Sequence, residues 1–270
     1  MTPAGLPQTL LLVVAGCGFS AHPAATSDAP HSDGARPIDA APMIDAPPDA
    51  PKQDAFMLAC TSSTLYAIDV DQQQATQIGP IATGQTTYSM FGLAGTSALL
   101  YGIPSSLADL LLIDASSGNV ISSRPIAKHT FYGFANAEGT WYVGTDASGE
   151  PNNTAHLYTI DPATGTETLI GAFGNGLTIA GDLAYVHQRG LYGSFYGPGC
   201  TPTCIASVNP TTGSANVLTY TGPTNVLSMS GFRGRLWGLS NTGTVYEFDP
   251  SSGATLGSFD TGISWADAAD

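Results

Sequence analysis

The chain has 270 residues, of which 43% are hydrophobic, 10% are charged and 32 are glycine, a composition typical of turn-rich all-β proteins with a sizeable core. Seven basic residues against 21 acidic ones give a net charge of −14, which excludes nucleic acid as a partner because phosphate binding needs clustered Lys and Arg. The same scarcity of basic residues excludes attachment to anionic lipid through a polybasic patch.

Residues 1–16 are predicted to be an export signal. Leu10–Ala15 is an apolar run far shorter than the roughly 20 residues of a membrane-spanning helix, and it ends at Gly16-Cys17. No Lys or Arg precedes this run, which departs from the usual basic start of such signals. The pattern nevertheless indicates export from the cytoplasm.

The end of the signal resembles the lipobox of bacterial lipoproteins, on the residues Val14-Ala15-Gly16-Cys17. The resemblance implies that the Cys17 thiol receives a diacylglyceryl group and that Cys17 becomes the first residue after cleavage. Gly18 stands where retention in the inner membrane usually requires Asp, so the resemblance favours an outer-membrane lipoprotein facing the periplasm or the surface. An ordinary cleaved signal with a free periplasmic or secreted product is the alternative.

Residues 17–55 are predicted to be this lipidated N-terminus followed by a disordered linker. Between Ala21 and Ala55 the chain has ten Ala, seven Pro and six Asp, with almost no large apolar side chains. Such a segment cannot bury enough surface to offset the entropy of ordering it. It would act as a spacer between a lipid surface and a folded head.

Residues 56–270 contain a recurring segment that closes on Asp or Asn. His156–Gly165, HLYTIDPATG, is the clearest copy, and the closing residue falls at positions 69, 114, 161, 209 and 249, at intervals of 45, 47, 48 and 40. The copies alternate with period two and are punctuated by Gly, Pro and Asn, as four-stranded propeller blades are. The sequence therefore predicts an all-β, five-bladed β-propeller with four-stranded antiparallel blades and a monomeric head.

The recurring segment is predicted to be the third of four strands, A to D, counted from the propeller axis outward. It is apolar on both faces, as a sheet packed between two neighbours requires. Blade one has Phe56–Cys60 as its strand B but no strand A, while Ile263–Asp267 is left over at the C-terminus. This last segment is expected to close the ring by pairing into the first blade. In blade four, Gly176–Ala180 and Leu183–Val186 are assigned to strands A and B.

The closing acids are interpreted as turn formers rather than catalytic carboxylates. In copies such as Asp161-Pro-Ala-Thr-Gly165, the acid accepts bonds from backbone N–H groups, Pro fixes φ, and Gly tolerates positive φ. The interpretation covers Asp114, Asp161 and Asp249. Asp69 and Asp71 hint at calcium, but the rest of a ligand loop is missing.

These D-x-x-T-G turns resemble those of the quinoprotein-like and YVTN-like propellers over most of the chain from Phe56 onward. The Trp that often follows Thr-Gly in quinoprotein repeats is absent, so pyrroloquinoline quinone is not supported and no cofactor is expected. Together with the lipobox and the Asp-Ala-Pro linker, the layout resembles the propeller lipoproteins of Gram-negative bacteria.

The B–C and D–A loops of a propeller share one face, and the A–B and C–D turns share the other. The A–B and C–D turns here are short and uniform, so they are interpreted as scaffold. The B–C loops vary, with the longest expected at Gly190–Thr203, and variable loops on a rigid frame usually carry binding sites. That loop holds three aromatics that would either bind a sugar or peptide or pack against blades three and four: Tyr192, Phe195 and Tyr196.

Two cysteines in this loop, Cys200 and Cys204, are predicted to form a small disulfide, because the compartment is oxidising and they lie so close in sequence. Zinc would need two further ligands that no motif supplies, so no metal site is predicted. Cys60 is expected to be a buried free thiol at the end of a strand.

Three histidines are expected on the B–C loop face, where they would meet acidic and basic neighbours in a metal or acid–base site. The candidate residues are His129, His156 and His187, with Asp146, Glu150 and Arg189 beside them. No activated serine or cysteine motif occurs, and the chain has only four glutamates.

The leading hypothesis for function is a lipid-anchored binding module that recognises a protein, peptide or glycan on its B–C loop face. The alternatives are an extracytoplasmic hydrolase or lyase that uses the three histidines, and a structural protein of the envelope without a small ligand. Histidines converging within about 4 to 5 Å of one point would favour the enzyme.

Overall fold

The computed structural model describes residues 56–96, 98–127, 131–148, 150–220, 223 and 225–269. The predicted signal peptide, Cys17 and the linker up to residue 55 lie outside the described residues, and so does His129. Within the described ranges no helix has the length and apolar character needed to cross a membrane.

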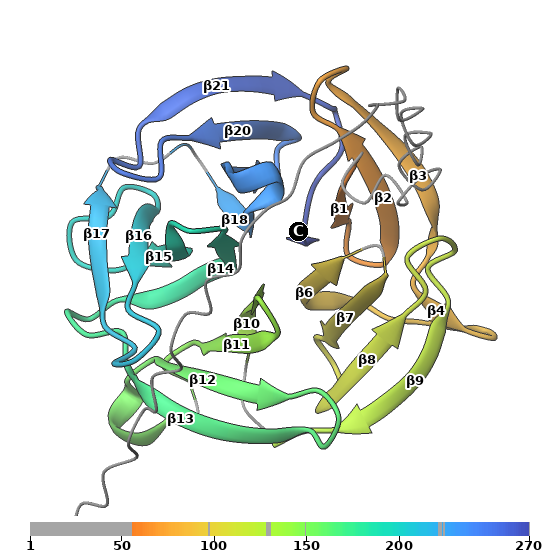
Figure 1. Cartoon of the computed structure of the whole chain (residues 1–270), viewed down its shortest axis with the longest axis horizontal. Coiled ribbons are helices and arrows are strands. Elements are labelled where there is room, and N and C mark those ends of the chain that lie inside the picture. Colours follow the sequence, from red (N-terminus) through yellow and green to blue (C-terminus); the bar gives the residue numbers. More distant parts are fainter. Residues whose placement is uncertain are drawn as a thin grey trace, which may run out of the picture. The chain divides into compact units, whose positions relative to one another are not determined.

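Five four-stranded antiparallel sheets stand in a ring around a central axis (Figure 1). Blade one is ordered β22 (Asp267–Ala269), β1 (Met57–Cys60), β2 (Thr64–Asp69) and β3 (Gln74–Pro80) from the axis outward. Blade two is β6 (Met90–Thr96), β7 (Leu99–Pro104), β8 (Asp109–Ile113) and β9 (Val120–Pro125). Blade three is β10 (Phe131–Ala137), β11 (Thr140–Thr145), β12 (His156–Asp161) and β13 (Thr166–Ala172).

Blade four is β14 (Thr178–Val186), β15 (Gly190–Tyr196), β16 (Cys204–Val208) and β17 (Ala215–Thr219). Blade five is β18 (Val226–Ser230), β19 (Leu236–Ser240), β20 (Thr244–Phe248) and β21 (Thr255–Asp260). A small hairpin, β4 (Ala82–Thr83) and β5 (Thr86–Thr87), and two 3₁₀ turns, η1 (Pro151–Asn153) and η2 (Phe232–Gly234), complete the described elements. The predicted five-bladed propeller is confirmed, with the recurring segment as the third strand of every blade.

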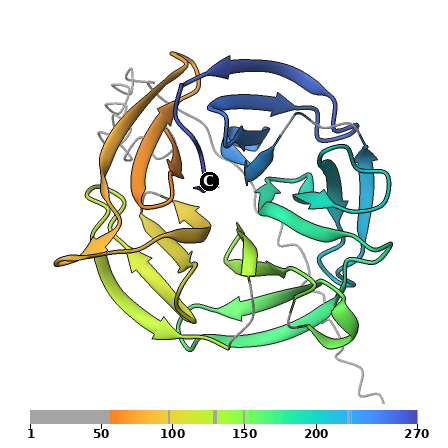
Figure 2. The same ribbon diagram turned by 180° about the vertical axis from the view of Figure 1, so that it is seen from behind.

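The ring closes through the C-terminal strand, as the sequence predicts. β22 pairs antiparallel with β1, with Leu58 opposite Ala269 and Cys60 opposite Asp267. The C-terminal segment runs inward to the centre of the ring (Figure 2). The strand begins at Asp267, so the predicted range Ile263–Asp267 is wrong in all but its last residue. The reason is Trp265, whose fully buried indole packs edge-on against Tyr66 between blades five and one.

Blade four departs from the prediction at its inner hairpin. The segments assigned to strands A and B are one nine-residue strand, β14, with a register shift between Ile179 and Leu183. Gly181 lies inside this irregularity because a Cβ there would stand 1.7 Å from the carbonyl oxygen of Leu227 on the neighbouring blade. Strand B is therefore β15, and the B–C connection of blade four shrinks from the predicted fourteen residues to positions 197–203.

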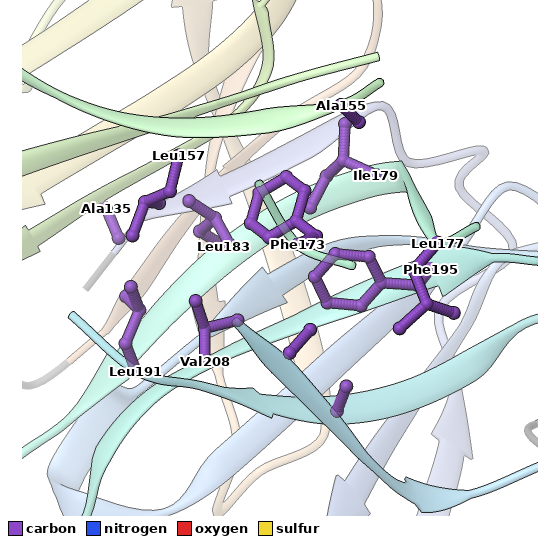
Figure 3. Close-up of a cluster of buried hydrophobic side chains, with 12 residues drawn as sticks. Ala135, Ala155, Leu157, Phe173, Leu177, Ile179, Leu183, Leu191, Phe195 and Val208 are labelled. Carbon is purple, nitrogen blue, oxygen red and sulfur yellow. The ribbon is translucent and has the colours of Figure 1, made fainter. Parts of the chain in front are cut away.

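The core consists of apolar clusters between neighbouring blades. Between blades three and four the rings of Phe173 and Phe195 meet edge to face with centroids 5.0 Å apart, among Leu157, Leu183 and Leu191 (Figure 3). Full burial of each such side chain contributes about 1.5–3 kcal/mol. Because both faces of the blades are covered in this way, the inner frame is rigid enough to hold side chains at its rims.

The closing acids form turns, which confirms their interpretation. Oδ1 of Asp161 accepts a 2.8 Å hydrogen bond from the N–H of Ala163, and its Oδ2 accepts one from the Thr164 hydroxyl. That hydroxyl bond is the main cause that lowers the pKa of Asp161. Asp114 and Asp249 are engaged in the same way by Ser116 and Ser251, and their pKa values are also lowered.

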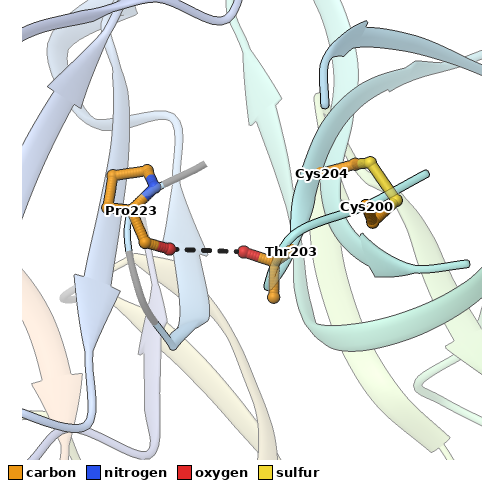
Figure 4. Close-up of a disulfide and its surroundings, with 4 residues drawn as sticks. All are labelled: Cys200, Thr203, Cys204 and Pro223. Atoms are coloured by element: carbon orange, nitrogen blue, oxygen red, sulfur yellow. Dashed lines mark hydrogen bonds between the residues drawn. A yellow bond between two sulfur atoms is a disulfide. The ribbon is translucent and has the colours of Figure 1, made fainter. Parts of the chain in front are cut away.

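The predicted disulfide is present between Cys200 and Cys204, whose Cα atoms are 5.1 Å apart (Figure 4). It spans the B–C connection of blade four, and the Thr203 hydroxyl inside it donates to the carbonyl oxygen of Pro223. Cys60 is a buried free thiol at the end of β1, as predicted.

Candidate functional site

On the B–C face, the structure brings His156 and Glu150 together. Nδ1 of His156 lies 3.2 Å from Oε2 of Glu150, and the Tyr158 hydroxyl donates a 2.9 Å hydrogen bond to the same oxygen. Asp146 belongs to the same B–C connection. Burial raises the pKa of Asp146, the N–H of Ser148 lowers it, and the charge of Glu150 raises it again.

The contacts within this group hold the B–C connection of blade three in place. The Glu150 side chain is only 1% exposed, and desolvation, with the hydrogen bond to Glu150, raises the pKa of Tyr158 to about 12. A buried carboxylate held by a strand tyrosine fixes the B–C connection of blade three onto β12. We therefore assign the cluster of Glu150, His156 and Tyr158 to the scaffold.

His187 and Arg189 lie on the opposite face, in the A–B turn between β14 and β15. The expectation that His156 and His187 converge is therefore wrong, because β14 continues through the position where the sequence suggests a turn. His129 is outside the described residues. Among the residues that the structure describes, no three His, Cys, Asp or Glu side chains are grouped as a metal ion would require.

The predicted aromatic loop is also rearranged. Tyr192 and Phe195 are buried on β15 and pack between blades, so neither is available to a ligand. Tyr196 ends this strand with 43% of its surface exposed and remains on the B–C face. The packing alternative is thus correct for two of the three aromatics.

The A–B turns surround a pocket, which we call the A–B depression. It has a volume of about 310 Å³ and is lined by turns of blades two to five, with polar and aromatic groups from Asn136, Glu138, Tyr185, His187, Phe232 and Arg233. Thr96 and the glycines at positions 95, 231 and 234 line the rest, and the glycines leave backbone within reach of a ligand. A concave site with convergent polar groups is the usual form of a small-molecule site.

Glu138 organises one side of the A–B depression. Its Oε1 accepts a 3.1 Å hydrogen bond from the Tyr185 hydroxyl and lies 2.7 Å from Nδ1 of His187. Desolvation, and then the hydrogen bond to Glu138, raises the pKa of Tyr185. The side chains of Glu138 and His187 are 60% and 64% exposed, so the carboxylate is accessible from solvent while its direction is fixed.

Arg233 belongs to the wall contributed by blade five. Its Nη1 donates a 2.7 Å hydrogen bond to Oδ2 of Asp71 in the C–D turn of blade one, and its guanidinium lies 5.0 Å from the centre of the Phe232 ring. The carboxylate pair Asp69 and Asp71 therefore serves a turn and an ion pair. The site places a fixed acceptor and a fixed cation in one pocket.

The sequence does not predict this site, because the A–B turns are short and uniform and are therefore interpreted as scaffold. A signal was nonetheless present: Glu138-Gly139 and Arg233-Gly234 put long charged side chains where tight turns usually have Asn or Asp. Both residues adopt left-handed backbone angles, with φ of 52° at Glu138 and 53° at Arg233. Charged residues at positions that favour glycine are candidates for function.

No protein-family model matches the sequence. No curated protein matches it. Solved structures similar to the fold include BamB from Moraxella catarrhalis, at 13% identity and a TM-score of 0.39, which covers 78% of this chain and 59% of BamB. A luciferin-regenerating enzyme has 15% identity, a TM-score of 0.43 and 77% coverage of both chains. The WD40 propeller domain of Doa1 has 11% identity, a TM-score of 0.41 and coverage of 78% of this chain and 67% of that one.

Such distant likeness concerns the fold alone, and the present chain spans about three fifths of BamB. The blades and their order define the class: a five-bladed β-propeller closed by its C-terminal strand. Its particular feature is a depression on the A–B face that is lined by both polar and apolar groups.

Proposed function

We propose that the protein is an extracytoplasmic, lipid-anchored binding module, and that its propeller holds a sugar unit of a glycan in the A–B depression. The observation that carries the proposal is the arrangement of Glu138, with its two partners Tyr185 and His187, on the wall of a 310 Å³ pocket. This volume lies at the lower end of the range for small-molecule sites, roughly 300–1,000 Å³.

The charge pattern favours a neutral ligand. Arg233 is paired with Asp71, and Glu138 accepts from Tyr185 and lies beside His187, so the pocket has one cation and one carboxylate on opposite walls rather than a cluster of like charges. A polyhydroxylated ligand donates to the second carboxylate oxygen of Glu138 and to the Tyr185 hydroxyl oxygen, whose own proton is held by Glu138, and accepts from the side-chain amide of Asn136. Hydrogen bonds to a charged acceptor contribute about 1.5–3 kcal/mol each.

The lipid anchor and the location rest on the sequence alone. Cys17 follows a short apolar run in a lipobox-like setting, and the Ala, Pro and Asp-rich segment after it supplies a spacer. The Cys200–Cys204 disulfide is consistent with an oxidising compartment.

A glycan array read with the full chain tests the ligand class. The proposal expects binding that is confined to glycans sharing one terminal or repeating sugar. Absence of binding across neutral glycans would contradict it and would favour a structural role in the envelope.

The anchor is tested separately by detergent partitioning and mass analysis of the mature protein. The expected result is a diacylglyceryl-modified N-terminal Cys17 that partitions into the detergent phase, with a Cys17→Ser variant that stays in the aqueous phase. A mature N-terminus elsewhere, without lipid, would contradict the anchor and leave the ligand proposal standing.

A further inference from the structure

Two aspartates lie fully buried in the inner ring of strands. Asp182 is on β14 of blade four, and Asp267 is the first residue of β22, the strand that closes the ring. Both side chains have no exposed surface. Isolated buried carboxylates are costly, so such a pair needs an explanation.

One oxygen of each carboxyl group is engaged by backbone. Oδ1 of Asp182 accepts 2.8 Å hydrogen bonds from the N–H groups of Phe134 and Leu183, and Oδ1 of Asp267 accepts one of 2.9 Å from Ala268. The N–H of Leu93 also donates to Asp267. Asp182 therefore joins blade four to blade three, and Asp267 joins the closing strand to blade two.

The second oxygen of each group has no donor. Oδ2 of Asp182 and Oδ2 of Asp267 are both buried and lack a hydrogen-bond partner within the described part of the chain. The small pocket next to the four backbone donors, Leu93, Phe134, Leu183 and Ala268, has no space for a water molecule. Two ionised carboxylates would both be acceptors, so neither could satisfy the other. One proton between them satisfies both.

We propose that Asp182 and Asp267 form a proton-binding site in which one proton bridges their Oδ2 atoms and fastens the ring-closing strand β22 to the inner ring. The step is a simple protonation: the pair of carboxylates takes up one H⁺ from solvent and becomes a carboxylic acid hydrogen-bonded to a carboxylate. Folding of the ring then requires this proton. The proposal is independent of the glycan site.

The electrostatics of the surroundings agree with this assignment. Burial raises the pKa of both groups well above the usual range, and the charge of Asp267 raises that of Asp182 further. The hydrogen bond between the two groups raises the pKa of Asp182 and lowers that of Asp267.

No cation neutralises the pair among the described residues of the strands around it. Cys60 of β1 faces the pair, and burial raises the pKa of its thiol, so the thiol adds no charge. β6 and β18 have no titratable side chain. The remaining titratable groups on β10 and β14 are Tyr132, which stacks on Phe91, and Tyr185, which donates to Glu138.

The sign of the pH effect follows. The pKa of the folded pair lies above the unfolded value of about 4. Between these two pKa values, the folded protein therefore holds more protons than the unfolded chain. Stability is highest near the unfolded pKa and falls as the pH rises through the folded pKa. One retained proton raises the unfolding equilibrium constant up to about tenfold per pH unit.

The test compares the pH dependence of unfolding in the full chain and in Asp182→Asn. The asparagine keeps an oxygen for the N–H groups of Phe134 and Leu183, and its amide donates to Oδ2 of Asp267 without a titrating proton. The expected result is that wild type releases about one proton on unfolding near pH 7, while Asp182→Asn releases none and loses the fall in stability between pH 5 and 8. Asp109→Asn, at the outer start of β8, is the control and should behave as wild type.

Infrared spectroscopy of wild type near pH 7 gives a readout that does not depend on a variant folding. The expected result is the carbonyl band of a protonated carboxylic acid, which disappears in Asp182→Asn. Absence of this band in wild type, or proton release on unfolding equal in wild type and Asp182→Asn, would overturn the proposal.

Discussion

Nδ1 of His187 lies 2.7 Å from Oε1 of Glu138, and this contact joins the A–B turns of blades three and four at the rim of the A–B depression. The residues are far apart in the chain and come from turns that differ in length. Their contact shows that the face of short turns, rather than the face of long loops, gathers an accessible carboxylate with fixed partners.

The backbone at Glu138 is held in a conformation that glutamate disfavours. Glu138 and Gly139 form a two-residue hairpin turn with φ of 52° and 92°, for which Asn-Gly is the preferred sequence. We expect Glu138→Asn to stabilise the propeller by about 0.5–1 kcal/mol while weakening ligand binding. Urea denaturation measures the first effect, and a loss of stability in this variant would show that the partners of Glu138 outweigh the strain.

Trp265 is expected to be essential for ring closure. Its buried indole fills the space between blades five and one, and its Nε1 donates to the hydroxyl of Thr261, which directly follows β21. Trp265→Ala should cost about 3–5 kcal/mol of unfolding free energy. Leu256→Ala, on the outer strand β21 with the side chain 63% exposed, should change stability by no more than about 0.5 kcal/mol. Equal effects of the two substitutions would contradict this role.

The disulfide should make a modest contribution to stability. It closes a loop with a sequence separation of 4, and loop-closure entropy then predicts about 2 kcal/mol. The double variant Cys200→Ala, Cys204→Ala avoids a buried unpaired thiol, and guanidinium denaturation measures the difference. Complete unfolding of that variant at 25 °C would contradict this prediction, because it would show that the disulfide stabilises the whole propeller and not only the B–C connection of blade four.

The turn aspartates should make the folding stability of the protein fall at low pH. Hydrogen bonds lower the pKa of Asp114, Asp161 and Asp249 in the fold, so their contribution is present above the unfolded pKa of about 4 and is lost as the pH falls through the folded values. A triple Asp→Asn variant should lose less stability between pH 5 and 2.5, because Asn209 already forms the same turn without a charge. Parallel acid profiles of the two proteins would contradict this assignment.

The sequence predicts the architecture well because the repeating Asp turn marks each blade at its C–D hairpin. It locates the closing strand only approximately, since Ile263–Asp267 alternates like a strand while the bulk of Trp265 forces that segment into the space between blades. In blade four, the sequence pattern predicts a turn at Gly181-Asp182. In the structure these residues form an irregularity inside one strand, because the Leu227 backbone approaches Gly181 closely and the Asp182 carboxylate is buried against blade three.

The site was less accessible to sequence reasoning for a related reason. One displaced turn moved His187 and Arg189 to the opposite face and put Tyr192 and Phe195 into the core. The A–B depression depends on contacts between turns of different blades, such as Arg233 with Asp71, which no local pattern encodes. The local feature that accompanies this arrangement is a positive φ at the charged residues Glu138 and Arg233.

The most direct test of the central claim compares three single variants in calorimetric titrations with a glycan that binds on the array. Glu138→Gln keeps the size of the side chain but removes its charge, and it should weaken binding about 10- to 100-fold. Two control variants should leave the affinity unchanged. Tyr196→Ser changes a side chain on the B–C face, and Glu247→Gln removes the charge of a β20 carboxylate that is paired with Arg235. Loss of affinity in Tyr196→Ser with full affinity in Glu138→Gln would return the binding site to the B–C loops and contradict the account.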